Sequence, residues 1–104
     1  MKKIEIKVQY FLGCPHYAEM LKNVKTAVGK FAGYVEYTEE IVDTNEKAVS
    51  TDFRGSPTLL INGKDFEDMP VPEQPSLSCR FYPGGIPSIE KISAVINDLI
   101  LSDH

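Results

Sequence analysis

The feature that most constrains the fold is a change in the period of apolar residues around Cys14 and Pro15. Over residues 3–11, apolar side chains alternate with polar ones, which predicts a strand with one buried face. Over residues 15–32 they recur at helical spacing, which predicts an amphipathic helix. Residues 34–42 alternate again, and an interruption near the middle of this run favours a strand at a sheet edge. A strand, a helix and a parallel strand form a βαβ unit, whose crossover is almost always right-handed.

The rest of the chain carries cap and turn signals. The inner face of the first predicted helix is expected to comprise Tyr17, Leu21, Val24, Val28 and Phe31. Asp43 begins a capping-box pattern that predicts a short helix over residues 44–51. Asn62-Gly63 follows a buried apolar run and predicts a β-hairpin. Ser88 is a suitable N-cap for a last amphipathic helix.

Length and charge narrow the class of protein. The 104 residues predict a single α/β domain over residues 1–104, because a chain of this length supports one core. The net charge of −4 and the lack of a basic patch argue against nucleic acid as a partner. No run is long and apolar enough to suggest a membrane partner. Glu5 and Lys7 interrupt the apolar run that a secretory signal would need, so we expect a cytoplasmic protein.

Two cysteines in a cytoplasmic protein favour redox chemistry or metal binding over a structural disulfide. Pro15 fits the first turn of a helix, which places the Cys14 sulfur near free backbone N–H groups at the positive end of the helix dipole. Such a position lowers the pKa of a thiol and populates the reactive thiolate. The alternative is that Cys14 is a small apolar residue filling a strand–helix junction.

Residues 68–87 are predicted to form a long irregular loop, because they contain five prolines and two adjacent glycines. Long loops are uncommon in small domains and are often functional. The second cysteine, Cys79, lies within this loop.

The order βαβ unit, β-hairpin, helix resembles the thioredoxin fold. Cys14-Pro15 matches the start of the active motif of that superfamily, and residues 55–58 (Gly-Ser-Pro-Thr) match the segment that carries its cis-proline. The resemblance covers nearly the whole chain. It implies a cis peptide bond before Pro57, which would face Cys14.

A closer resemblance is to small prokaryotic thioredoxin-like proteins of unsettled function, some of which are labelled alkylmercury-lyase-related. It rests on residues 13–15 (Gly-Cys-Pro), 79–82 (Cys-Arg-Phe-Tyr) and 85–88 (Gly-Ile-Pro-Ser). Active thioredoxins carry Cys-x-x-Cys, whereas Tyr17 here takes the place of the second cysteine. Exchange between two neighbouring thiols is therefore not expected within this motif.

The residues around Cys14 leave alternatives open. By resemblance, the loop after the hairpin can reach the cysteine edge of the fold. Cys79 is then either a resolving thiol, whose disulfide with Cys14 would contribute about 4 kcal/mol in the chain-entropy model, or a lone buried thiol. His16 either tunes the thiolate, binds metal, or is a solvated residue of the first turn. Tyr17 is expected in the core, with its hydroxyl in reach of the sulfur. Arg80 either stabilises an anion or is a solvated surface residue.

Three functions are compatible with the sequence. In the first, the partner is a disulfide- or thiol-bearing protein or small molecule: Cys14 attacks a disulfide or another thiol-reactive group, and Cys79 or an external thiol resolves the mixed species. Pro57 and Tyr17 complete this site. In the second, Cys14 and Cys79, with His16 nearby, bind a soft metal ion such as mercury; no other cofactor is expected. In the third, the chain is a non-catalytic binding module that pairs the Pro57 edge with a peptide strand.

Overall fold

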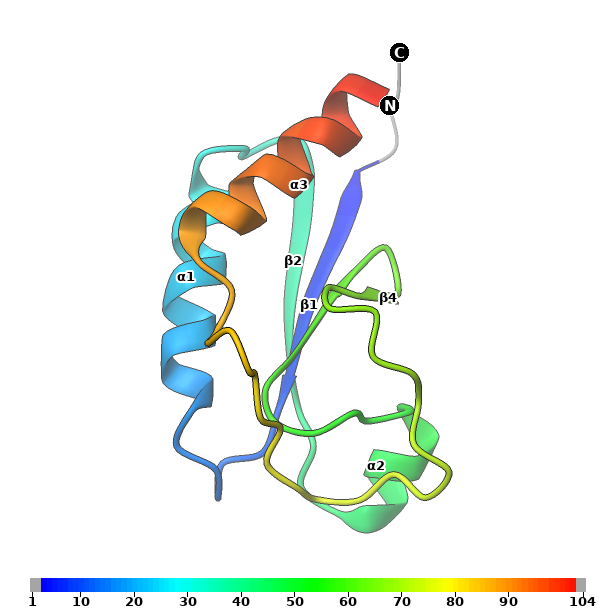
Figure 1. Cartoon of the computed structure of the whole chain (residues 1–104). Coiled ribbons are helices and arrows are strands. Elements are labelled where there is room, and N and C mark those ends of the chain that lie inside the picture. The colour runs from blue at the N-terminus through cyan, green and yellow to red at the C-terminus, as the bar shows by residue number, and fades with distance from the viewer. Residues whose placement is uncertain (1–2, 103–104) are drawn as a thin grey trace.

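The computed structural model describes residues 3–102, which form a four-stranded sheet with two long helices on one of its faces (Figure 1). In chain order the elements are β1 (Ile4–Tyr10), α1 (Tyr17–Gly29), β2 (Val35–Ile41), α2 (Asn45–Ser50), β3 (Thr58–Ile61), β4 (Lys64–Asp65) and α3 (Ile89–Ser102). The fold class is α/β, with the predicted βαβ unit, hairpin and C-terminal helix all present. No helix in residues 3–102 has the length and apolar character needed to span a membrane.

The strand order β2-β1-β3-β4 places β1 inside the sheet. β1 runs parallel to β2 and antiparallel to β3, and β3 turns back into β4. The edge position predicted for residues 34–42 is confirmed, since β2 has a neighbour on one side only. Asn62 and Gly63 both have positive φ, at 52° and 80°, as a two-residue hairpin turn requires.

The main core lies between the sheet and the helices α1 and α3. From β1 it takes Ile4, Ile6, Val8 and Tyr10. The fully buried residues of α1 are Met20, Val24 and Ala27, whereas the other residues predicted for this face are only partly buried and lie at its margins. Large apolar residues therefore indicate the inner face only approximately, because the flexible Met20 and the small Ala27 fill its centre beside Val24.

Helix α1 begins at Tyr17, two residues later than the sequence predicts. Pro15 and His16 instead belong to a turn. A separate turn precedes them, in which the N–H of Cys14 donates to the carbonyl oxygen of Phe11 at 3.1 Å. Cys14 therefore ends the turn after β1 and is separated from the first residue of the helix by Pro15 and His16.

A second, smaller core lies at the end of the molecule that carries α2. Its buried residues are Val42, Ala48 and Phe53, and the partly buried Phe11 and Leu77 pack against them. The short helix α2 is capped by Thr44 rather than by Asp43, because the Thr44 hydroxyl oxygen accepts a hydrogen bond from the N–H of Lys47 at 3.0 Å. This core supports both the turn before Cys14, through Phe11, and the long loop, through Leu77.

Candidate functional site

The two cysteines form a disulfide at the end of the sheet where β1 leads toward α1. Cys14 follows the turn after β1, and Cys79 lies in the loop between β4 and α3, with the two Cα atoms 5.8 Å apart. Cys79 is therefore not a lone buried thiol. The residues are 65 positions apart in the sequence, so the disulfide joins the start of the βαβ unit to the loop that follows the hairpin.

Backbone hydrogen bonds hold Cys79 against the segment that leads into β3. The N–H of Ser56 donates to the carbonyl oxygen of Ser78 at 2.8 Å, and the N–H of Arg80 donates to the carbonyl oxygen of Ser56 at 2.9 Å. The peptide bond that follows Ser56 is cis. The sulfur of Cys14 lies 3.8 Å from the same Ser56 oxygen. Ser56 thus contacts both halves of the disulfide.

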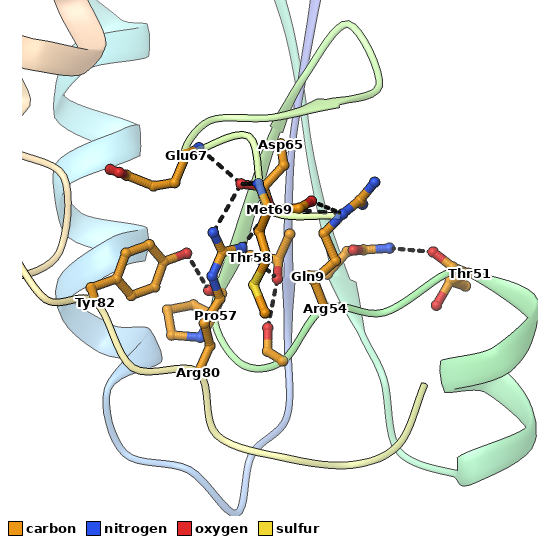
Figure 2. Close-up of polar contacts among 11 residues, drawn as sticks. Gln9, Thr51, Arg54, Pro57, Thr58, Asp65, Glu67, Met69, Arg80 and Tyr82 are labelled. Atoms are coloured by element: carbon orange, nitrogen blue, oxygen red, sulfur yellow. Dashed lines mark hydrogen bonds and ion pairs between the residues drawn. The ribbon is translucent and has the colours of Figure 1, made fainter. Parts of the chain in front are cut away.

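A buried ion pair anchors the residue next to Cys79 (Figure 2). The Arg80 guanidinium donates from Nη1 and Nη2 to the two carboxylate oxygens of Asp65, at 2.5 and 2.8 Å. Burial alone would raise the pKa of the Asp65 carboxyl, but hydrogen bonds from Arg80 and from the N–H groups of Glu67 and Met69 outweigh it and hold the pKa below its usual range. Arg80 is therefore not a solvated surface residue. The anion that it stabilises is the carboxylate of Asp65, which leaves its guanidinium unable to bind an external anion.

Tyr82 and Thr58 extend this network, as Figure 2 shows. The Tyr82 hydroxyl donates to the carbonyl oxygen of Pro57 at 2.6 Å, and the guanidinium carbon of Arg80 lies 4.6 Å from the centre of the Tyr82 ring. The Thr58 hydroxyl donates to the carbonyl oxygen of Gly55 at 2.6 Å and accepts from Arg80 at 3.3 Å. The loop is therefore fixed to the entrance of β3 by contacts that involve neither sulfur.

The roles that Gly55 and Asp65 play in positioning Cys79 are missed by reasoning from the sequence. Gly55 has a φ of +106°, and a Cβ atom there would lie 2.9 Å from the Cβ of Arg80, so only glycine allows the loop to approach this closely. A glycine directly before the Ser-Pro pair is a signal that could have drawn attention to it. Asp65 has no such signal, because nothing in the spacing of the two residues pairs it with Arg80.

The two cysteines differ in exposure. Cys14 is fully buried, whereas Cys79 is exposed and borders a groove of about 440 Å³. The groove is lined by His16, Glu19, Cys79, Arg80, Phe81, Tyr82, Gly85 and Ile86. Phe81 is 83% exposed, which is unusual for a large apolar residue. The disulfide is therefore open to solvent from the side of Cys79.

Comparison with protein-family models gives no match, and no curated protein matches the sequence. Among solved structures, the chain superposes on chloroplastic thioredoxin z with a TM-score of 0.65, covering 95% of this chain and 80% of that one at 14% sequence identity. The chain has a thioredoxin-like fold. A likeness at this level of identity shows the fold and leaves the activity to be argued from the site. The finer resemblance to alkylmercury-lyase-related proteins gains no support from this neighbour.

Two further residues of the expected site lie as one of the alternatives from the sequence has them, Tyr17 packed against the core and His16 exposed. Tyr17 is partly buried, and its ring stacks on that of Tyr10 with the centroids 4.8 Å apart. His16 is exposed and lines the groove together with Cys79. Within residues 3–102, no group of three or more His, Cys, Asp or Glu side chains is placed to hold a metal ion. His16 therefore does not complete a three-ligand site with the two cysteines.

Proposed function

We propose that this thioredoxin-like protein exchanges thiols and disulfides through the pair Cys14 and Cys79. The observation that carries the proposal is that two cysteines far apart in the sequence are bonded beside the Ser56–Pro57 segment, with one of them exposed to a groove. Thiol–disulfide exchange requires an accessible sulfur. A purely structural cross-link would need neither the exposure nor the groove.

The proposed reaction transfers two electrons. In one direction, two partner thiols form a disulfide and release two protons and two electrons, which convert the Cys14–Cys79 disulfide into two thiols. In the other direction, the two protein thiols reduce a partner disulfide. The partner is a disulfide- or thiol-bearing protein or small molecule. The proposed compartment is the cytoplasm, where glutathione competes for accessible disulfides.

The anchored loop explains how a pair outside Cys-x-x-Cys could act together. In that motif the helix itself holds both thiols close. Here the hydrogen bonds to Ser56 and the ion pair between Arg80 and Asp65 hold Cys79 beside Cys14 without help from the S–S bond. After reduction the two thiols stay at a high effective concentration, so that one can resolve a mixed disulfide formed on the other.

Equilibration with mixtures of reduced and oxidised glutathione tests this function. Alkylation of free thiols followed by mass spectrometry measures the oxidised fraction. The wild type should pass from dithiol to disulfide in one two-electron transition and should turn over a disulfide substrate. Cys14→Ser and Cys79→Ser should each abolish the transition and the turnover. A wild-type pair that is inert to glutathione, or single variants that turn over as well as the wild type, would refute the proposal.

A second candidate function is the binding of a soft metal ion, such as mercury, by the reduced pair. The meeting of the two sulfurs favours it, because thiolates select soft metals. The reduced wild type should then form an equimolar complex with Hg(II), and either single serine substitution should weaken that complex. Metal binding without turnover of any disulfide would favour this function over exchange. A protein that shows neither activity would leave the non-catalytic binding module.

A further inference from the structure

We infer that Cys79, rather than Cys14, is the sulfur that bonds to the partner, and that the partner is a polypeptide cysteine with apolar neighbours. The inference rests on the proposed function and assigns the roles within it. It reverses the order expected from the sequence, in which Cys14 makes the first attack and Cys79 resolves.

Burial decides which sulfur can react first. A thiolate attacks a disulfide sulfur from the side opposite the leaving sulfur, so the attacked atom must be open to solvent. Cys14, which ends the turn after β1, is fully buried at 0% exposure. Cys79 is exposed at the rim of the groove. An incoming partner thiolate therefore reaches the sulfur of Cys79 with Cys14 as the leaving group.

The electron balance follows from this geometry. The bond from the partner sulfur to Cys79 forms, the bond from Cys79 to Cys14 breaks, and the electron pair stays on Cys14 as a thiolate. A second partner thiolate then attacks the partner sulfur and releases Cys79. In the reducing direction, the Cys79 thiolate attacks the partner disulfide, breaks its S–S bond and releases one partner thiolate. The Cys14 thiolate then attacks the sulfur of Cys79, which forms the Cys14–Cys79 bond again and releases the second partner thiolate.

The backbone around Cys79 is built to present this sulfur in both redox states. Ser78 and Arg80, its two neighbours, are hydrogen bonded to Ser56, and Arg80 is paired with the buried Asp65. Opening the disulfide therefore does not require the loop to leave the site. Since the loop stays, Cys79 keeps its place at the groove after reduction.

The lining of the groove indicates the class of partner. Phe81, two residues after Cys79, is 83% exposed and offers an aromatic surface next to the reacting sulfur. The guanidinium of Arg80 is turned inward and neutralised by Asp65, whereas Glu19 adds a carboxylate to the lining. The Glu19 carboxylate would repel a small anionic thiol such as glutathione, and Arg80 offers no free guanidinium to offset this repulsion. A polypeptide with apolar side chains beside its cysteine would instead bury Phe81.

Two single-cysteine variants test the entry sulfur. The probe is a neutral peptide with leucine on both sides of a cysteine activated as a mixed disulfide with thionitrobenzoate, whose release is coloured. The adduct is confirmed by mass. Cys14→Ser, which keeps only Cys79, should react about tenfold faster or more than Cys79→Ser. An equal or faster reaction of Cys79→Ser would overturn the inference and leave the proposed function standing. The wild-type disulfide is also mixed with the same peptide carrying a free cysteine thiol. If neither variant forms an adduct and the wild-type disulfide does not exchange with this thiol, both the inference and the proposed function fail.

The partner class is tested in the Cys14→Ser background. Adding Phe81→Ala should slow adduct formation with the leucine peptide about fivefold or more and should not change the rate with glutathione activated in the same way. The matched control is Leu12→Ala, which removes an apolar side chain from a residue that is 58% exposed and lies two positions before residue 14. It should leave both rates unchanged. Equal rates for glutathione and the leucine peptide, or no effect of Phe81→Ala, would overturn the assignment of the partner.

Discussion

Replacing Asp65 with asparagine should destabilise the protein strongly, because it leaves the Arg80 guanidinium buried without a counter-charge. The two side chains are 2% and 4% exposed and share two direct hydrogen bonds. Removing one partner of such a buried pair costs about 3–5 kcal/mol. Asparagine keeps the shape and one acceptor oxygen, so we expect the lower end of this range. The loss is large against the total stability of about 5–15 kcal/mol that is usual for a domain.

Urea denaturation of the reduced protein measures this effect without the contribution of the disulfide. With a urea dependence of about 2 kcal/mol per molar, a loss of about 3 kcal/mol lowers the unfolding midpoint by about 1.5 M. The matched control is Asp68→Asn, the same substitution at an exposed residue whose φ of 57° asparagine also tolerates. It should change stability by no more than about 0.5 kcal/mol. An Asp65→Asn variant as stable as this control would refute the role given to the ion pair.

The effect of Asp65→Asn should also depend on pH. The folded protein holds the pKa of the Asp65 carboxyl below its usual value. The resulting stabilisation is fully present above the unfolded pKa of about 3.9 and is lost as the pH falls through the lower folded pKa. The difference in the free energy of unfolding between wild type and variant should therefore shrink below about pH 4. A difference that stays constant into the acid range would contradict the assignment.

Two further substitutions test the attachment of the loop, each by urea denaturation. Tyr82→Phe removes a buried hydroxyl that donates to the carbonyl oxygen of Pro57 at 2.6 Å, and it should lower the free energy of unfolding by about 1–2 kcal/mol. Its control is Tyr34→Phe, at an exposed tyrosine. An equal loss of stability in the two variants would show that the hydrogen bond contributes nothing. Gly55→Ala places a Cβ atom 2.9 Å from that of Arg80 at a φ of +106° and should cost about 1–3 kcal/mol. Gly84→Ala, whose Cβ would meet no atom within 4 Å, is its control, and equal stability of the two variants would contradict the close approach.

The elements that the sequence predicts well are those with a regular period or a short local signal. The turn at Asn62-Gly63 and the cap at Ser88 depend on neighbouring residues alone, and both are present in the structure. The alternation in β1 is confirmed up to Val8, whereas Gln9, which the pattern places on the exposed face, is buried. The start of α1 is predicted less well. The hydrogen bond that closes the turn before Pro15 involves Phe11, a residue at the end of the preceding apolar run, and no local signal announces it.

The site could be predicted only in part, because the residues that complete it come from segments without periodicity. Cys14 is marked by its place between a strand and a helix. The path of the loop that carries Cys79 is set by the contacts of Arg80 with Asp65 and of Ser56 with its neighbours. These contacts form between residues far apart in the chain, and proline restricts φ without fixing where a loop docks.

The position of β2 at a free edge of the sheet affects how copies of this chain behave toward one another. An edge strand exposes unpaired N–H and C=O groups that can pair with another molecule. β2 carries three glutamates within seven residues, of which Glu39 is paired with Lys25. Two copies paired through this edge would bring the charges of Glu36 and Glu40 close to those of the other copy, and like charges destabilise strand pairing. The other edge, β4, has only two residues. The charges on β2 therefore oppose sheet extension between copies at neutral pH. Acid removes these charges and high salt screens them, so self-association through β2 is expected first under those conditions.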